Sequence, residues 1–345
     1  MKNLYAITIP ALALAAALAG QNGSAPAKGA IEKIKVHGKA LEGNLEGDSP
    51  DRDVFVYLPP SYASDSRRRY PVVYLLHGYG LTAERWLTFL DLASAADQNM
   101  TAGTAREMIL VNPDAFTLYN GSMYSNSATT GDWEAFIAND LVGYIDGHYR
   151  TIADRMSRGL GGHSMGGYGT MRVGMKHPEV FSTLYAMSSC CLSANLTPNA
   201  QTMATLEAAK TPEEAKANRA AMTMLASAAA WSPNPKNAPF YFDLPMKGGA
   251  IQPAVVAKWA ANAPLAMVDQ YVPNLKRYKA IALEVGLQDG LLAGNKTLDD
   301  TLTQFGVAHT YETYKGNHTN HVKERFDQKV LPFFSSNLNF AGGKK

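Results

Sequence analysis

The chain has 345 residues, of which 46% are hydrophobic, so it can form one large domain with a sizeable core or two modest ones. Its formal net charge is +2, which provides no strong field for binding nucleic acid or an anionic membrane. The densest basic run, residues 67–69, lies in a polar stretch before an expected strand and indicates a solvated turn.

Residues 1–19 have the features of a secretory signal peptide. Lys2 is followed by an apolar stretch, residues 7–19, that is too short to cross a bilayer. Residues 17–19 read Ala-Leu-Ala, a small-residue pattern that predicts cleavage before Gly20. We therefore expect a secreted or periplasmic protein.

The rest of the chain predicts a single catalytic domain. Residues 20–28 are small and polar and indicate a linker, residues 29–340 form the expected domain, and residues 341–345 are a tail. Gln21 stands where a bacterial lipoprotein would carry its lipidated cysteine, so we expect no lipid anchor. Beyond residue 19 no segment is long and apolar enough to span a bilayer, so we expect no membrane contact after cleavage.

Apolar runs that alternate with helical patterns predict a mostly parallel, doubly wound α/β sheet. The run at residues 72–76 is continuous, as expected of a strand that is covered on both faces. Residues 158–161 are rich in glycine and form a poor strand by composition. The expected strands are residues 34–36, 53–58, 72–76, 108–111, 158–161, 181–187, 281–285 and 309–314.

Helices are expected between these strands. Asp132 is placed to cap a helix whose apolar side chains fall on one face, and residues 165–176 predict a helix that contains glycine. Residues 195–262 are rich in Ala, Met, Pro and Lys and break the strand–helix rhythm, and Thr211 marks a helix start within them. We interpret residues 195–262 as a largely helical insertion or cap near the active site, with ordinary scaffold helices as the alternative.

The most informative motif is Gly-His-Ser-Met-Gly at residues 162–166, a G-x-S-x-G sequence centred on Ser164. Where a strand turns sharply into a helix, this pattern exposes a serine hydroxyl so that a histidine can remove its proton. Glycine is needed two residues before and after the serine because larger side chains would collide across the turn. Ser164 is therefore the candidate nucleophile.

Asp289 and His318 are the candidate partners of Ser164. In this type of site the acid and then the histidine follow the serine along the chain. Asp289 comes just after the expected strand 281–285, at the carboxyl end where ligands collect in open α/β sheets. His318 follows the next expected strand, residues 309–314. The spacing between Asp289 and His318 fits one helix and that strand. We predict that Asp289 fixes the tautomer of His318, which acts as the base.

Three other histidines, His77, His163 and His321, lie in or near these motifs. His321 is the alternative base, although we favour His318. His318 and His321 together could also suggest a metal site, but two histidines without further placed ligands are a weak site, and we expect no metal. His77 and His163 are interpreted as structural neighbours of the site.

The oxyanion that forms when a serine attacks a carbonyl group needs two N–H donors. The backbone N–H of Met165, directly after the nucleophile, is the expected first donor. The second is expected from the loop after strand 72–76, where residues 77–80 read His-Gly-Tyr-Gly, and we choose the N–H of Tyr79.

The two cysteines of the chain, Cys190 and Cys191, are adjacent. Neighbouring cysteines seldom form a disulfide because the bond geometry strains the peptide between them. We interpret both as small buried residues at a strand end. A core of this size needs no disulfide, even in an exported protein.

Together these motifs resemble the "putative esterase" family of α/β-hydrolases, which includes esterase D-like and feruloyl esterases, acetylxylan, tributyrin and siderophore esterases, S-formylglutathione hydrolase and the mycobacterial mycolyltransferases. The resemblance implies an α/β-hydrolase fold, a nucleophilic serine, an acid and a histidine base at the three positions chosen above, and no cofactor. Two segments depart from the family pattern, residues 189–191 and the insertion 195–262. The resemblance spans roughly residues 41–338 and is carried by residues 69–78, 121–127, 131–134, 162–167, 286–290 and 316–318.

The function implied is that of a secreted serine carboxylic-ester hydrolase that works through an acyl-enzyme. Its expected partner is a small-molecule or polysaccharide-linked ester, such as a feruloyl or acetyl ester of a carbohydrate or another short or aryl ester. The alternatives are transfer of the acyl group to a sugar alcohol and hydrolysis of siderophore esters or thioesters. A non-catalytic binding protein on this fold is a further class, which the presence of all three triad residues disfavours. Trp86, Tyr124 and Asn126 are candidate substrate-contacting residues.

Overall fold

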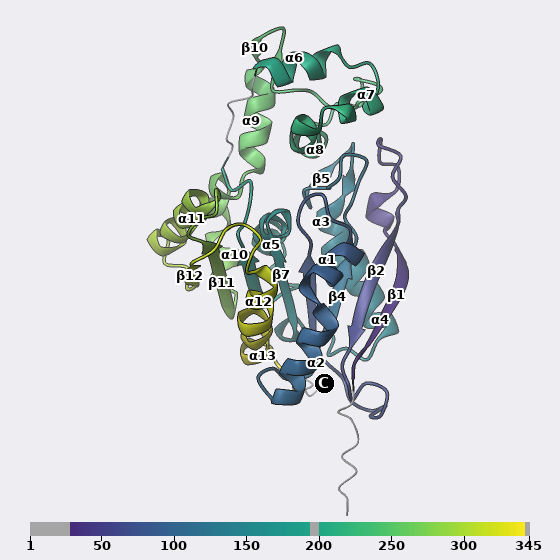
Figure 1. The fold of residues 1–345 in the computed structure, drawn as a ribbon, viewed down its shortest axis with the longest axis vertical. Coiled ribbons are helices and arrows are strands. Elements are labelled where there is room, and N and C mark those ends of the chain that lie inside the picture. The colour runs from purple at the N-terminus through teal and green to yellow at the C-terminus, as the bar shows by residue number, and fades with distance from the viewer. Residues whose placement is uncertain (1–27, 194–199, 342–345) are drawn as a thin grey trace, which may run out of the picture.

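The computed structural model of the chain describes residues 28–193 and 200–341. Its centre is an eight-stranded sheet in the order β1-β2-β4-β3-β7-β8-β11-β12 (Figure 1). From β4 to β12 every neighbouring pair is parallel, whereas the pairs β1–β2 and β2–β4 at one edge are antiparallel. The strands are β1 (Ala30–His37), β2 (Asp51–Leu58), β3 (Val72–Leu76), β4 (Ile109–Pro113), β7 (Arg158–His163), β8 (Thr183–Met187), β11 (Ala280–Gly286) and β12 (Thr310–Tyr314).

All eight expected strands are present, with small differences in their ends. The largest difference is at β1, which begins four residues before the predicted start and pairs along its length with β2. Most side chains of β1 are exposed, so the strand has little apolar pattern by which to recognise it. The predicted signal peptide, residues 1–19, lies outside the described residues. No helix within residues 28–193 or 200–341 has the length and hydropathy that crossing a bilayer requires.

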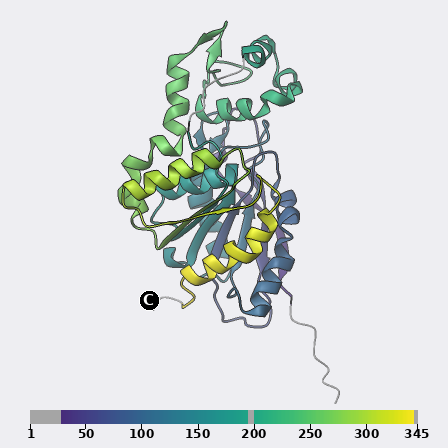
Figure 2. The same cartoon turned by 60° about the vertical axis from the view of Figure 1, so that its left-hand side comes forward.

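Helices cover both faces of the sheet, as predicted for a doubly wound fold (Figure 2). Along β3, Val72, Tyr74 and Leu76 belong to one buried cluster, and the alternating Val73 and Leu75 belong to the other. The first cluster packs against α3, α4, α5, α8, α10 and α11, and the second against α1, α2, α12 and α13. The helices of these two layers are α1 (Ala83–Leu90), α2 (Leu92–Ala102), α3 (Trp133–Ala135), α4 (Val142–His148), α5 (Met165–Lys176), α8 (Met222–Trp231), α10 (Val268–Leu275), α11 (Leu292–Gln304), α12 (Val322–Arg325) and α13 (Leu331–Asn337).

The helix predicted after Asp132 is built from three pieces. The Asp132 side chain accepts the backbone N–H of Ala135, which caps α3. A π-helical turn, η2 (Phe136–Leu141), joins α3 to α4 and a similar turn, η6 (Phe326–Val330), joins α12 to α13. Short 3₁₀ turns complete the fold at η1 (Lys39–Leu41), η3 (Arg155–Ser157), η4 (Arg219–Ala221) and η5 (Pro264–Ala266).

The segment from residue 200 to 262 forms a group of helices beyond one end of the sheet, at the top of Figure 1. Its α8 is tied to the loops near the sheet by hydrogen bonds from Trp231 Nε1 to Ser125 Oγ (3.2 Å) and from Ser127 Oγ to a backbone carbonyl. Thr211 caps α7, as predicted. The group also contains α6 (Ala200–Ala208), α7 (Pro212–Ala217), α9 (Pro253–Asn262) and the two-stranded hairpin β9 (Met246–Lys247) and β10 (Ala250–Ile251), while a second small hairpin, β5 (Asn126–Ser127) and β6 (Gly131–Asp132), lies beneath it.

The glycine-rich strand β7 lies in the middle of the sheet, between β3 and β8. A Cβ atom at Gly159 would lie 2.5 Å from the ring of Phe334 on α13, and one at Gly161 would lie 3.2 Å from the same ring. Phe334 is completely buried. The strand therefore lacks side chains on this face because a helix packs directly on its backbone, and pairing on both sides offsets its poor propensity.

This packing predicts opposite effects for two glycine-to-alanine changes. Gly159→Ala should lower the free energy of unfolding by about 1–3 kcal/mol because the new methyl group overpacks the core. Gly143→Ala, on an exposed stretch of α4 with no atom within 4 Å of the new Cβ, should raise it by about 0.5–1 kcal/mol. Urea unfolding measures both. A Gly159→Ala protein as stable as the wild type would contradict the packing of Phe334 on β7.

Candidate active site

Ser164 occupies a strained turn between β7 and α5. Its backbone has φ 59° and ψ −113°, a combination that L-residues rarely adopt. Three backbone hydrogen bonds hold the turn: the N–H of Ser164 donates to Met187 O (2.9 Å), and its C=O accepts from the N–H of Tyr168 (2.9 Å) and of Cys190 (3.1 Å). The serine is thereby fixed by α5 and by the end of the neighbouring strand β8.

The glycines of the motif are needed for close approach, as their positions predict. A Cβ atom at Gly166 would lie 2.0 Å from the carbonyl oxygen of Leu76 at the end of β3. At Gly162 it would lie 2.6 Å from the carbonyl group of Gly166. Helix α5 therefore begins in direct backbone contact with the end of β3.

The structure brings Ser164, His318 and Asp289 together. His318 Nε2 lies 2.9 Å from Ser164 Oγ, and His318 Nδ1 lies 2.8 Å from Asp289 Oδ2. The Asp289 carboxylate is buried, and its other oxygen accepts the N–H of Leu291 (2.9 Å). Because a carboxylate can only accept, Nδ1 of His318 carries the proton and Nε2 is free to accept the hydroxyl proton of Ser164.

The loops that carry Asp289 and His318 are joined directly beyond the ends of β11 and β12. The N–H of Gln288 donates to Gly316 O (2.8 Å), so the two strands remain paired past their ends. A Cβ atom at Gly286 would lie 2.3 Å from that same carbonyl oxygen. The acid and the base are therefore held at a fixed separation by backbone contacts.

His321 does not compete for the serine. Its Nδ1 lies 2.8 Å from a carboxylate oxygen of Glu324 near the surface. Both ring nitrogens of His318 are already in contact with Ser164 and Asp289. The two histidines therefore have separate partners and do not face a common ligand position.

His163, the residue before Ser164, supports His318, the predicted base. Its ring packs on the ring of His318 with centroids 4.6 Å apart, and its Nε2–H donates to the backbone carbonyl of His318 (2.8 Å). On its other side the Trp86 ring stacks at 5.9 Å. Burial lowers the pKa of His163 to about 4, with the neighbouring His318 as a second cause. A neutral His163 thus holds the loop of His318 in place.

The two expected oxyanion donors lie beside Ser164. Met165 is the first residue of α5, so its N–H has no partner within the helix. The loop of Tyr79 approaches the nucleophile closely, since a Cβ atom on Gly78 would lie 3.6 Å from the Cβ of Ser164. Among the described residues, neither the N–H of Tyr79 nor that of Met165 donates a hydrogen bond within the protein. Both donors are therefore available to a ligand.

The direction of the Tyr79 N–H is set by His77, a residue for which the sequence predicts only a structural role near the site. His77 Nε2 accepts the N–H of Ala115 (2.9 Å), so its proton is on Nδ1, which donates to the carbonyl of Gly78 (2.9 Å). In a planar trans peptide the C=O and N–H groups point in opposite directions. The carbonyl of Gly78 points to His77, and the N–H of Tyr79 therefore points away from it.

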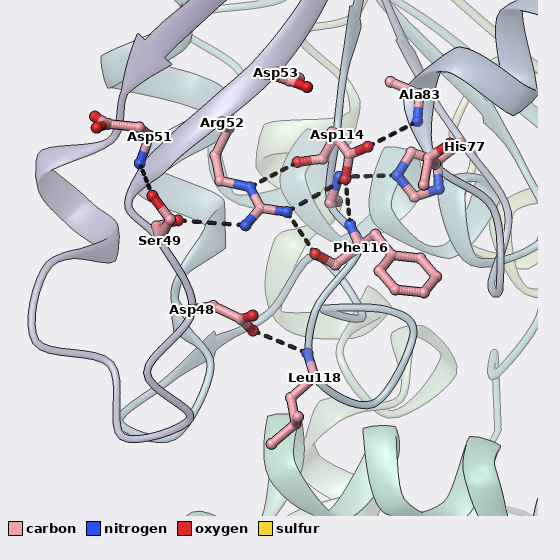
Figure 3. A network of polar contacts seen from close by, with 12 residues as sticks. Asp48, Ser49, Asp51, Arg52, Asp53, His77, Ala83, Asp114, Phe116 and Leu118 are labelled. Carbon is pink, nitrogen blue, oxygen red and sulfur yellow. Dashed lines mark hydrogen bonds and ion pairs between the residues drawn. The ribbon is translucent and has the colours of Figure 1, made fainter. Parts of the chain in front are cut away.

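A buried polar network holds the turn after β4 that contacts His77 (Figure 3). The guanidinium group of Arg52 donates to the backbone carbonyls of Asp114 (3.1 Å) and Phe116 and faces the Asp114 carboxylate (3.3 Å). That carboxylate also accepts the N–H of Ala83 at the start of α1 (3.1 Å). The network therefore fixes the position of Ala115, the residue in this turn whose N–H donates to His77 Nε2. Burial lowers the pKa of His77, which keeps the ring neutral.

Two of the three predicted substrate-contacting residues are buried. Trp86 and Tyr124 are both 0% exposed. Trp86 stacks against His163, and the Tyr124 hydroxyl donates to a carbonyl in the Tyr79 loop (3.2 Å). This corrects the prediction: both side chains support the site from beneath and present no surface to a substrate. Asn126 is exposed, and its side-chain oxygen accepts a backbone N–H of α3 (2.8 Å).

Cys190 and Cys191 follow β8, next to the serine turn. Both are partly exposed, which corrects the expectation that they are buried.

A cavity of about 750 Å³ lies within the helical group, lined by residues that include Leu206, Phe240 and Val255. Ser164, Asp289 and His318 are not among its lining residues, so it is separate from the triad.

With this geometry in place, comparison with known proteins gives the family. A family model described as "Putative esterase" matches residues 49–331, well over half of the chain. The chain belongs to this esterase family. The matched residues contain the serine turn, both partner loops and both expected oxyanion donors, so the predicted resemblance is confirmed.

Curated relatives of this family member include a protein named as an esterase from Mycobacterium tuberculosis, 34% identical over 135 residues. Another is an endo-1,4-beta-xylanase/feruloyl esterase from Xylanibacter ruminicola, 30% identical over 131 residues. The matches cover 38% and 36% of this chain but only 27% and 18% of the two relatives. The chain therefore matches a minor part of each of these longer proteins.

Solved structures of esterases share the fold. A ferulic acid esterase superposes with a TM-score of 0.64 at 22% identity, over 90% of this chain and 100% of its own. An S-formylglutathione hydrolase from Staphylococcus aureus superposes with a TM-score of 0.58 at 16% identity, over 90% and 99% of the two chains. At these identities the likeness establishes the α/β-hydrolase fold.

The buried, neutral His163 predicts a loss of stability in acid. Its pKa is about 4 in the folded protein against an ordinary 6.5, so between these values only the unfolded chain binds the proton. Stability is then full above pH 6.5 and falls as the pH drops towards 4. Urea unfolding should show that the wild type loses up to about 3 kcal/mol more than His163→Asn over this range. Parallel pH profiles of the two proteins would contradict the assignment.

Proposed function

We propose that this member of the esterase family is a serine carboxylic-ester hydrolase that works through an acyl-enzyme formed on Ser164. The observation that carries the proposal is the continuous chain of contacts from Ser164 Oγ through the His318 ring to the buried carboxylate of Asp289. A serine hydroxyl becomes a nucleophile when a base of this kind removes its proton. The two free N–H groups beside the serine supply the second requirement of acyl transfer, stabilisation of an oxyanion.

In the acylation step, His318 Nε2 takes the proton of Ser164 as Oγ bonds to the ester carbonyl carbon. The carbonyl electrons move to oxygen, and the N–H groups of Tyr79 and Met165 donate to that oxyanion. As the tetrahedral intermediate collapses, His318 returns the proton to the leaving alcohol. The charge of Asp289 stabilises the imidazolium while the carboxylate stays ionised. Water activated by His318 then attacks the acyl-enzyme and releases the acid.

The proposed substrates are feruloyl or acetyl esters of carbohydrates, or other short or aryl esters, encountered outside the cytoplasm. One curated relative carries feruloyl esterase in its name, and a ferulic acid esterase shares the fold over nine tenths of the chain. The signal-like residues 1–19 support export. A panel of acetyl, butyryl, octanoyl and feruloyl esters tests the acyl group, and failure of every ester would point to amides or thioesters.

Removal of the nucleophile tests the reaction itself. Ser164→Ala should lower kcat for p-nitrophenyl acetate by at least about a thousandfold, because the acyl-enzyme can no longer form. Its thermal unfolding should remain cooperative, since within residues 28–193 and 200–341 the Ser164 hydroxyl is hydrogen-bonded to His318 alone. Retained turnover in a folded Ser164→Ala protein would refute the proposal.

The orientation of the Gly78–Tyr79 peptide gives a second test. His77→Gln removes the ring that holds the Gly78 carbonyl and should cost about 3 kcal/mol of transition-state stabilisation, or roughly a hundredfold in kcat, with little change in KM. His148→Gln, an exposed histidine on α4, is the matched control and should leave both constants unchanged. Far-ultraviolet circular dichroism verifies the fold of both variants. Unaltered kcat in His77→Gln would show that the ring does not set this peptide.

A further inference from the structure

The adjacent thiols of Cys190 and Cys191 face each other next to the proposed nucleophile. Their sulfur atoms lie 2.7 Å apart without being bonded, and both residues are partly exposed. A disulfide bond is about 2.05 Å long, so less than 1 Å of movement separates the thiols from bonding distance. The sequence alone argues against a bond between them, because the disulfide geometry strains the peptide between adjacent cysteines.

The backbone explains why these two side chains converge. Cys191 has φ 57°, and Ser188 at the start of the segment has φ 43°, both in the left-handed region. Between them Ser189 is clamped by the buried side chain of Asn295, which accepts its N–H and donates to its C=O, both at 3.0 Å. The N–H of Cys190 is committed to Ser164 O. The segment is therefore held at three successive points in a turn that brings the sulfurs together.

A bond between these sulfurs would be a strained one. Consecutive Cα atoms across a trans peptide are about 3.8 Å apart, below the range of about 4.4–6.8 Å in ordinary disulfides. Strained and exposed disulfides have more oxidising potentials and are readily reduced. The arrangement therefore suits a thiol pair that cycles between two redox states better than a permanent crosslink.

We propose that Cys190 and Cys191 form a redox-active dithiol, a modification site that exchanges with small-molecule disulfides at the edge of the active site. In the first step one thiolate attacks a disulfide RS–SR, which forms a protein–S–SR bond and releases RS⁻. In the second step the neighbouring thiolate attacks the protein sulfur of that bond, which forms the Cys190–Cys191 disulfide and releases a second RS⁻. The two protein thiols are oxidised, RS–SR is reduced to two thiols, and the two protein protons go to the released thiolates.

The order of attack follows from the surroundings of the two thiols. Contact with the Cys191 side chain, together with burial, raises the pKa of the Cys190 thiol well above its ordinary value. Cys191 is therefore the residue that attacks first. Once Cys191 is in a mixed disulfide, its thiol no longer raises the pKa of Cys190, which can then complete the exchange.

The experiment exposes reduced, folded protein to excess oxidised glutathione and reads intact mass and free thiols. Because the chain has only two cysteines, each product has a distinct mass. The wild type should lose both thiols and two hydrogens while retaining no glutathione. Cys190→Ser and Cys191→Ser should each retain one glutathione, because neither can take the second step, and their thermal unfolding shows whether they are folded.

Reversal and denaturation complete the test. Excess reduced glutathione should restore both thiols in the folded wild type. In denaturant, where the turn is lost, the wild type should accumulate mixed disulfides, with closure at least about tenfold slower than in the folded protein. Two retained glutathiones in the folded wild type, a disulfide-linked dimer, thiols that do not react in any of the three proteins, or a disulfide that resists reduction would each overturn the proposal.

Discussion

The close approach of helix α5 to the end of β3 is the constraint on which the rest of the site depends. It requires glycine at positions 162 and 166, where any side chain would meet backbone atoms. It also forces Ser164 into a strained conformation, a cost of order 1–3 kcal/mol. The strain persists because hydrogen bonds to Met187, Tyr168 and Cys190 hold the peptide on both sides. In return the hydroxyl stands at a fixed position, within reach of a histidine from a different loop.

Neutral histidines do much of the positioning around this serine. His163 and His77 are buried, and burial lowers the pKa of both, so neither ring carries a charge that would compete with the triad. Each donates to a backbone carbonyl instead, His163 to the peptide of His318 and His77 to that of Gly78. One ring thus fixes the loop of the proposed base, and the other fixes the direction of the Tyr79 N–H, a proposed oxyanion donor. Protonation of His77 would place a second N–H against the N–H of Ala115, which Nε2 accepts in the neutral form.

The sequence predicted which polar residues meet at this site better than it predicted the packing around them. Asp289 and His318 could be found because each follows a strand that its own residues predict, and parallel strands end at the same edge of a sheet. β7 could not be recognised from its own residues, because its glycines reflect the packing of Phe334, which is distant in sequence. Trp86 likewise stacks on His163, a residue distant in sequence. The environment of a side chain cannot be predicted from nearby sequence when its neighbours come from other segments. The convergence of the Cys190 and Cys191 thiols after β8 is another example, since Asn295 helps to hold their turn.

Tyr168 shows how the serine turn is linked to the helical group beyond the sheet. Its N–H donates to the carbonyl of Ser164, while its hydroxyl donates to the carbonyl of Asn262 at the end of α9 (2.9 Å) and contacts Ser125 Oγ (3.1 Å). Its ring also packs on Trp231 of α8, with centroids 5.7 Å apart. A single rigid side chain in the first turn of α5 therefore joins the nucleophile to α8 and α9. In a close-packed interior such contacts transmit strain, so the packing of the helical group bears directly on the strained serine turn.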